Sequence, residues 1–271
     1  MIYDFRFELS FKNIFQLENK LNFCASNNIY KINIPCKGII KKEFLNKIVE
    51  FIGQNYKNFD VIYHYSLFHQ YSKNREYSYL DFLNFINKCN SFNTNKILLV
   101  SGSNKKKNFE VLDVLRDYKC ENEFNVDLGI AYNPYLKYYY DIGGERLRFE
   151  KKISSGLIKS IWFQFGTDIK LLETELNFIK KVINEDLSNS NDQNVRLFGS
   201  LLVPSRQFIS RFKFRPWKGV FISDMYLNSL DDFCKFTKDL IEFYFDNNIC
   251  PVIETECSSK DKLEDIYNLL K

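Results

Sequence analysis

Short apolar runs alternate with longer amphipathic segments along the whole chain. The short runs are rich in Ile, Val, Phe and Tyr, which is typical of β-strands. We predict strands at 2–9, 30–36, 60–67, 96–102, 124–133, 160–166, 195–203 and 250–257. The longer segments repeat apolar residues every three or four positions, which is typical of helices. We predict helices at 13–28, 42–56, 78–92, 109–119, 143–156, 168–187, 229–248 and 258–270.

The segment 42–56 illustrates the helical pattern. Phe44, Ile48 and Ile52 fall on one face at a spacing of four, with lysines and a glutamate elsewhere. Ser258 is a plausible N-cap for the last helix. A further short segment at 205–213 precedes 229–248 and indicates an insertion in the seventh strand–helix unit.

Eight strands that alternate with helices imply parallel pairing through right-handed crossovers. A closed barrel and an open doubly wound sheet both satisfy this pattern. An open dinucleotide-binding sheet would show GxGxxG after its first strand, but the turn Glu8–Asn13 contains no glycine, and no phosphate-binding GxxxxGK[ST] occurs. We therefore predict a (β/α)8 barrel, a fold of about 250 residues that would occupy 1–271 as a single domain.

Composition narrows the class of protein. Apolar residues make up 45% of the 271 residues, which is enough for a globular core, and the net charge of +4 does not by itself indicate nucleic acid. The short basic run Lys105–Lys107 is either a solvated loop or an anchor for an anionic ligand tail. Seven cysteines without CxxC spacing suggest neither disulfides nor zinc, and no signal peptide or membrane span is evident. We expect a cytoplasmic protein with no membrane or nucleic-acid partner, and whether it forms a homo-oligomer stays open.

Catalytic groups in this fold come from the carboxyl ends of the strands and the loops that follow them. A glutamine within the apolar run Ile161–Phe165 needs hydrogen-bond partners if it is buried, so Gln164 is the most informative candidate. A lone strand histidine such as His64 is more often a structural residue than a ligand. The strand-end candidates are Glu8, His64, Ser101–Ser103, Ala131–Pro134, Gln164, Asp168, Ser200–Ser205, Glu254 and Glu256.

Several of these segments resemble the methylenetetrahydrofolate reductase family. Leu147–Gly156 followed by Trp162–Asp168 resembles the family's Lys-Val-x-Ala-Gly-Ala stretch leading to Thr-Gln-x-Phe-Phe-Asp, with one extra residue between Gly156 and Gln164. Weaker matches follow in the same order over the whole chain. They are Phe7–Ser10, Tyr63–Ser66, Leu99–Ser103, Ala131–Pro134 and Gly199–Ser205.

The resemblance implies a barrel that binds FAD and passes a hydride from NAD(P)H to a reduced folate, 5,10-methylenetetrahydrofolate. Glu8 would be the catalytic acid that protonates the departing folate nitrogen. Gln164 and Ser103 would bind the substrate, with the Gln164 amide pairing with the pterin edge. The positions implied for cofactor binding are His64, Gly102, Tyr132 and Lys152.

The chain also departs from the family's pattern. Ser103 replaces the family's aspartate beside the flavin, Ser101 replaces an arginine, and Leu136 replaces a histidine. Two alternatives to the reductase therefore stay open. One is a flavin-free relative that binds a reduced folate or transfers one-carbon units, and the other is a non-catalytic barrel that serves as a partner subunit.

Overall fold

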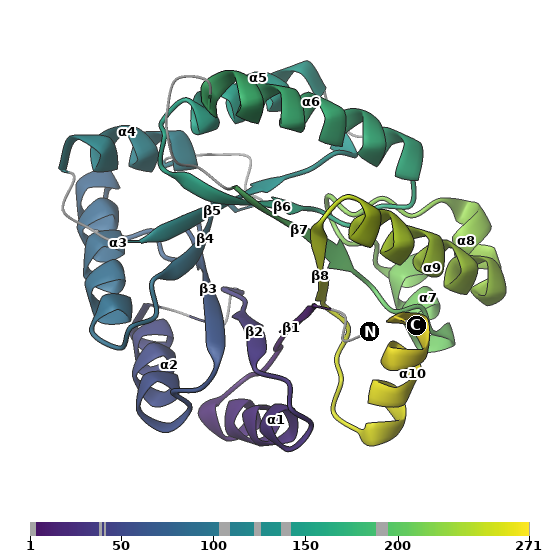
Figure 1. Ribbon diagram of the computed structural model, residues 1–271. Coiled ribbons are helices and arrows are strands. Elements are labelled where there is room, and N and C mark those ends of the chain that lie inside the picture. Colours follow the sequence, from purple (N-terminus) through teal and green to yellow (C-terminus); the bar gives the residue numbers. More distant parts are fainter. Residues whose placement is uncertain are drawn as a thin grey trace. The chain divides into compact units, whose positions relative to one another are not determined.

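The computed structural model describes most of the chain as regular strand–helix units. It describes residues 4–37, 40, 42–102, 109–121, 126–136, 142–187 and 195–270. The eight strands form a closed barrel in the order β1-β2-β3-β4-β5-β6-β7-β8 (Figure 1), so the predicted (β/α)8 fold is confirmed. Within the described ranges, none of the helices combines the length and apolar character needed to cross a membrane.

The strands are short and follow one another in sequence order. They are β1 (Arg6–Glu8), β2 (Lys31–Ile34), β3 (Asp60–Ser66), β4 (Lys96–Val100), β5 (Asp127–Tyr132), β6 (Ile158–Phe163), β7 (Arg196–Leu201) and β8 (Ile249–Ile253). The predicted strands overlap all of these, but every strand ends earlier than predicted, β6 at Phe163 instead of 166 and β8 at Ile253 instead of 257. Gln164 and Glu254 therefore lie directly after β6 and β8 rather than inside them.

A helix follows every strand, and the seventh connection holds three. The helices are α1 (Ile14–Ser26), α2 (Lys42–Asn55), α3 (Arg75–Asn90), α4 (Val111–Glu121), α5 (Ile142–Ile153), α6 (Ile169–Leu187), α7 (Arg206–Phe214), α8 (Asp224–Asn228), α9 (Leu230–Asp246) and α10 (Lys260–Leu270). The segment predicted at 205–213 is α7, whereas the short α8 was not predicted. The N-cap prediction for the last helix was wrong by one residue, because Ser259 precedes α10 and its hydroxyl accepts from the Lys262 amide.

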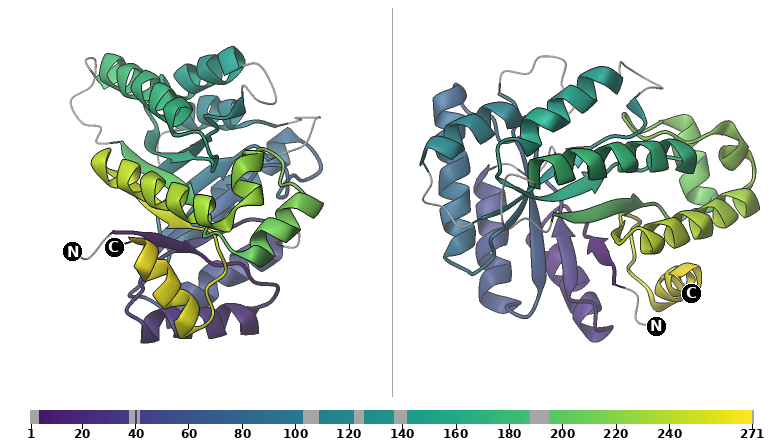
Figure 2. Two further views of the ribbon diagram at one scale, coloured as in Figure 1. Left: turned by 90° about the vertical axis from the view of Figure 1, so that its right-hand side faces the viewer. Right: turned by 45° about the horizontal axis from the view of Figure 1, so that its top comes forward.

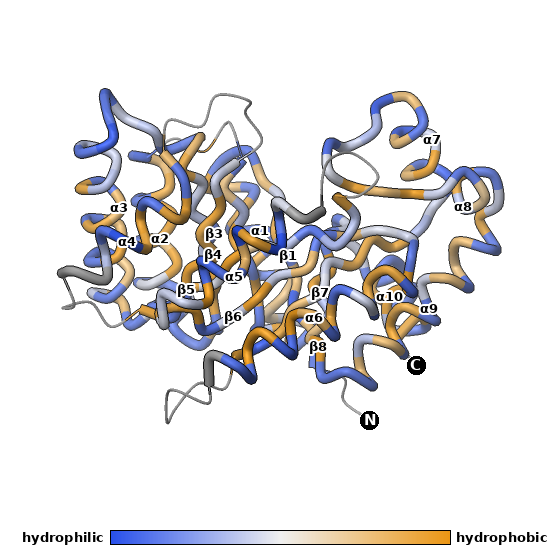
Figure 3. Tube along the Cα trace, turned by 90° about the horizontal axis from the view of Figure 1, so that it is seen from above, coloured by the Kyte–Doolittle hydropathy of each residue, from blue (hydrophilic) through white to orange (hydrophobic). Residues whose placement is uncertain are grey.

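The chain divides into two compact units. The amino-terminal unit comprises Phe7–Ile130 with Ser154–Ser160, and the carboxy-terminal unit comprises Met1–Arg6, Ala131–Ile153 and Ile161–Lys271. In the first unit α2 and α3 pack outside the strands, and in the second α9 runs along β8 (Figures 1 and 2). Figure 3 shows mainly hydrophobic residues along β4 and mixed residues along the covering helices, as expected for amphipathic helices on a buried sheet.

Register determines which side chains point into the barrel. Glu8 pairs with Asn33, and Asn33 pairs with Ile62, so these three share one face of the sheet. His64 lies two residues after Ile62 and shares that face, because side chains alternate along a strand. Tyr65 lies on the opposite face and packs on Phe82 of α3, at 5.0 Å between ring centroids.

Three turns that lead from a helix to the next strand contain an asparagine with a positive φ. They are Asn28, Asn93 and Asn248, with φ between 55° and 57°. Each follows a helix end, where an amide just beyond the cap donates back to a helical carbonyl, as the Asn28 amide does to Ala25. This left-handed ending is usually made by glycine, and asparagine is the residue that most readily substitutes for it.

Candidate functional site

The amino-terminal unit holds a buried carboxylate at the carboxyl end of β1. Glu8 is 9% exposed. Its Oε1 lies 3.2 Å from the Lys37 ammonium, and its Oε2 lies 3.9 Å from Nδ1 of His64. One carboxylate thus lies between an ammonium at ion-pair distance and an imidazole that is beyond direct hydrogen-bond distance.

Strand packing explains why His64 faces Glu8. Tyr63 and Tyr65, on either side of His64, turn outward and lie against Phe85 of α3 at centroid distances of 6.2 and 5.0 Å. Alternation along β3 then directs His64 to the face that carries Glu8. The structure therefore brings together two of the residues singled out from the sequence.

Lys37 was missed by the sequence analysis. It lies three residues beyond β2, and its ammonium also donates to Ser10 Oγ at 2.9 Å, just after β1. The available signal was its position after a strand's carboxyl end, where functional groups of this fold gather. A single lysine after a short strand has no periodicity that distinguishes it from a solvated surface residue.

Gly102 makes a tight turn after β4. Its φ is +87°, and a Cβ built at this position would lie 2.5 Å from the Phe68 Cβ. Only glycine fits such a position without strain. Ser103, predicted to bind substrate, lies outside the described residues.

The carboxy-terminal unit holds a second polar cluster, at the carboxyl ends of β5 and β6. Asn133 donates through Nδ2 to the Gly219 carbonyl at 2.9 Å, and its Oδ1 accepts from the Tyr135 amide at 2.9 Å. A Cβ on Gly219 would lie 3.9 Å from Gln164 Nε2. Among the described residues the Gln164 side-chain amide makes no hydrogen bond, so its donor and acceptor are both available to a ligand.

The loop that carries Gly219 is fixed to the end of β6. Phe221 forms a parallel bridge with Gly166, and its carbonyl accepts from the Thr167 amide at 3.0 Å. The Tyr135 ring stacks on Phe221 at 6.4 Å and 23°. These contacts hold the loop close to Gln164, so the cluster is pre-organised rather than formed on binding.

An aromatic layer lies below this cluster. Trp162 of β6 stacks on Phe198 of β7 at 4.1 Å and 14°. Two residues further along β7, Ser200 donates a short hydrogen bond to Glu254 Oε1. Because alternate residues share a face, Ser200 lies above the aromatic layer, on the side of the carboxyl ends.

Tyr132, a predicted cofactor contact, is directed away from the barrel interior. Its hydroxyl donates a short hydrogen bond to Glu175 of α6, a carboxylate that is 1% exposed. Arg146 of α5 binds the same carboxylate with Nε at 3.1 Å and Nη2 at 2.6 Å. Burial, and then the hydrogen bond to Glu175, hold the pKa of Tyr132 well above its ordinary value, so the hydroxyl remains a donor.

The other predicted positions are dispersed. Lys152 lies in the last turn of α5, just before the chain enters β6, and such a turn lies at the amino ends of the strands. Asp168 caps α6, because its Oδ1 accepts from the Leu171 amide at 2.9 Å. The structure therefore does not gather Tyr132 and Lys152 with the strand-end groups.

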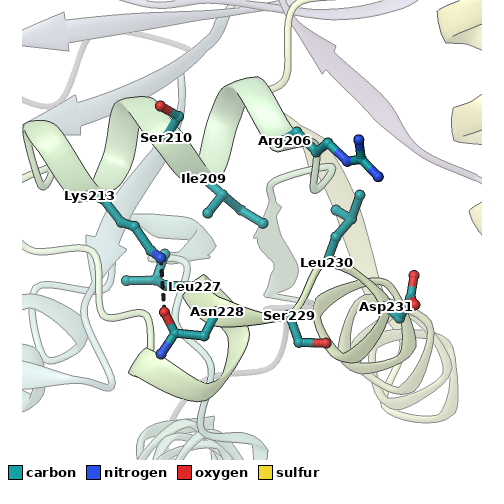
Figure 4. A pocket seen from close by; sticks show the side chains of 9 residues that line it. All are labelled: Arg206, Ile209, Ser210, Lys213, Leu227, Asn228, Ser229, Leu230 and Asp231. Atoms are coloured by element: carbon teal, nitrogen blue, oxygen red, sulfur yellow. Dashed lines mark hydrogen bonds between the residues drawn. The ribbon is translucent and has the colours of Figure 1, made fainter.

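Two surface pockets are described in the carboxy-terminal unit. One has a volume of about 610 Å³ and lies between α7 and the start of α9, with Arg206 and Lys213 on one side and Asp231 on the other (Figure 4). The other, of about 390 Å³, includes Asp168 and Tyr226. Among the described residues no group of three His, Cys, Asp or Glu side chains could hold a metal ion.

Comparison with known proteins supports the fold alone. The sequence matches no protein-family model and no curated protein. Active domain 2 of a thermostable chitinase from Pyrococcus furiosus aligns with a TM-score of 0.54 at 13% identity, over 94% of this chain and 84% of that one. A dihydrodipicolinate synthase family protein from Coccidioides immitis aligns at 0.45 and 10% identity, over 98% and 75%. At these identities the chitinase likeness supports a (β/α)8 barrel and nothing finer.

Proposed function

We propose that this chain is an enzyme that acts on a reduced folate by acid–base chemistry, with Glu8 as the proton donor. The observation that carries the proposal is the buried Glu8 carboxylate between the Lys37 ammonium and the His64 imidazole, at the carboxyl end of a barrel strand. The family resemblance supplies the substrate class.

In this proposal the two carboxyl oxygens of Glu8 have separate tasks. Oε1 accepts from Lys37, which holds the carboxyl group in place. Oε2 faces His64 and would carry the proton. When the N–CH2–N bridge of a methylene folate opens, that proton goes to the departing nitrogen together with the electrons of the broken C–N bond. An iminium carbon remains, ready for attack by a nucleophilic co-substrate, and His64 would return a proton to Glu8.

A flavin site finds little support in the described residues. Four positions were carried over for FAD from the family: His64, Gly102, Tyr132 and Lys152. The Tyr132 hydroxyl is bound to Glu175, and Lys152 lies in the last turn of α5. These two would have to leave their present positions to contact a flavin at the strand ends, so we favour the flavin-free alternative.

The absorbance spectrum of the purified protein separates the two versions. A colourless protein that takes up no added FAD is expected. A yellow protein with flavin bands would restore the flavin-dependent reductase with NAD(P)H as donor. Either outcome leaves the folate proposal to be tested by itself.

The folate proposal is tested by calorimetry and by turnover. Wild-type protein should bind 5,10-methylenetetrahydrofolate or 5-methyltetrahydrofolate. Glu8→Gln should retain this binding but turn over 5,10-methylenetetrahydrofolate about 100-fold or more slowly, because a general acid contributes on the order of 10²–10⁴-fold to the rate. Glu43→Gln, an exposed change in the same unit, is the matched control. Absence of folate binding, or Glu8→Gln turnover within about tenfold of wild type, would overturn the proposal.

Gln164 allows a second test within the carboxy-terminal unit. Gln164→Leu removes an amide that makes no hydrogen bond among the described residues, so it should weaken folate binding by about 10- to 100-fold with little change in melting temperature. Asn133→Leu is the counterpart. It removes the bonds to Gly219 and Tyr135, so it should lower the melting temperature. Equal folate affinity in Gln164→Leu and wild type would show that this amide is not a substrate contact.

A further inference from the structure

The inserted segment after β7 is basic, aromatic and exposed. Residues 206–218 contain five cations and no acidic residue, whereas the whole chain has a net charge of only +4. The cations are Arg206, Arg211, Lys213, Arg215 and Lys218. All six positions from Lys213 to Lys218 are exposed, and Figure 3 shows hydrophilic and hydrophobic residues close together at α7.

Two large aromatic side chains in this segment face solvent. Phe214 is 92% exposed and Trp217 is 45% exposed. The inner face of α7 uses other residues for the core, Ile209 and Phe212, both of which are buried. The exposure of Phe214 and Trp217 is therefore not required by the packing of the helix.

Trp217 is held in place from below. Its ring meets Phe208 at 5.6 Å and 78° and Phe212 at 6.2 Å and 65°. Lys213 is also anchored, since its ammonium donates to Asn228 Oδ1 at 2.8 Å (Figure 4). The segment thus presents exposed cations and rings on a supported surface.

We propose that residues 206–218 bind the surface of an anionic lipid bilayer. Aromatic rings interleaved with Arg and Lys fit the boundary between headgroups and acyl chains, where rings insert and cations meet lipid phosphates. This differs from the sequence-based expectation of no membrane partner, and it concerns peripheral attachment, because none of the described helices could span a bilayer.

The arrangement fits a bilayer better than a protein or a single-stranded nucleic acid. The centre of a protein interface is depleted in charge, yet Phe214 lies between Lys213 and Arg215, and Trp217 precedes Lys218. Nucleic-acid stacking needs open ring faces along a basic groove, whereas Trp217 is partly covered by Phe208 and Phe212.

The test uses the full chain with vesicles of phosphatidylcholine alone or with 30% phosphatidylserine. The chain has only two tryptophans, and Trp162 is buried, so a blue shift of fluorescence on adding vesicles would report Trp217. We expect sedimentation with the anionic vesicles, a blue shift, and release at high salt. Phe214→Ser should weaken binding by about tenfold or more, and Arg215→Glu by about fivefold or more.

Matched controls lie in the other unit. Phe15→Ser removes a phenylalanine that is 69% exposed on α1, and Lys47→Glu reverses an exposed charge on α2. Both should bind vesicles as wild type does. The proposal fails if wild type does not sediment with anionic vesicles, if Phe214→Ser and Arg215→Glu bind as tightly as the controls, or if the protein binds poly(U) or an acidic protein but no vesicle.

Discussion

The network of Tyr132, Glu175 and Arg146 gives a sharp test of where Tyr132 acts. Tyr132→Phe removes one donor to a carboxylate that is 1% exposed, while the two hydrogen bonds from Arg146 remain. A hydrogen bond to a charged group contributes about 1.5–3 kcal/mol. Because Arg146 still satisfies Glu175, we expect the lower end, about 1.5 kcal/mol, or a fall in melting temperature of roughly 3–6 °C for a chain of this size.

A double-mutant cycle tests whether this loss of stability comes from the hydrogen bond between Tyr132 and Glu175. Thermal melts of Tyr132→Phe, Glu175→Gln and the double variant should show a coupling of about 0.5–3 kcal/mol. Tyr77→Phe, at a tyrosine that is 52% exposed, should melt as wild type does. If Tyr132→Phe melts within about 1 °C of wild type but loses affinity for FAD, then Tyr132 is a cofactor contact and the structural role argued above is wrong.

Other expected outcomes follow from burial and backbone geometry. Gly102→Ala should lower the free energy of unfolding by about 2 kcal/mol or more, because of its positive φ and the nearby Phe68. Gly144→Ala in α5, with nothing within 4 Å of its Cβ, should be neutral or stabilising by up to about 1 kcal/mol, and thermal melts that show both variants alike would contradict the geometry. Burial raises the pKa of Tyr118 from 10.0 to about 12. It also raises the pKa of Tyr63, Tyr65 and Tyr244 well above 10.0. Raised folded-state pKa values give stability that is complete below pH 10 and lost as pH rises above it, so a melting temperature that stays flat between about pH 8 and 11.5 would refute this expectation.

The alternation of apolar runs and amphipathic segments predicted eight parallel strand–helix units, and the absence of a phosphate-binding glycine motif then favoured the closed barrel. Where the pattern is strong the bounds were predicted well, and the helix predicted at 42–56 agrees with α2 to within one residue at each end. The start of α3 was missed by three residues, because it is set by Asn74, whose side chain accepts from the Tyr77 amide. Such a cap carries no periodicity, and α8 has only five residues, too few to show any.

The candidate sites were only partly predictable. Glu8 and His64 were both singled out as strand-end residues, but their proximity follows from the register of β1, β2 and β3, which the sequence does not give. Lys37 was not singled out, since its contact with Glu8 depends on the path of a loop. Asp168 has the sequence position of a functional group, and in the structure its Oδ1 caps α6.

The three left-handed asparagines have a consequence for how this protein could change. In a (β/α)8 barrel the turns that lead into strands affect stability, while those at the carboxyl ends carry function. Asn28, Asn93 and Asn248 all lie in turns of the first kind. Glycine would adopt the same conformation without steric cost. Asn→Gly at these three positions would remove the steric cost of the left-handed conformation. The stability gained could offset the cost of new, destabilising side chains around Glu8 or Gln164, so the two ends of the barrel could be engineered independently.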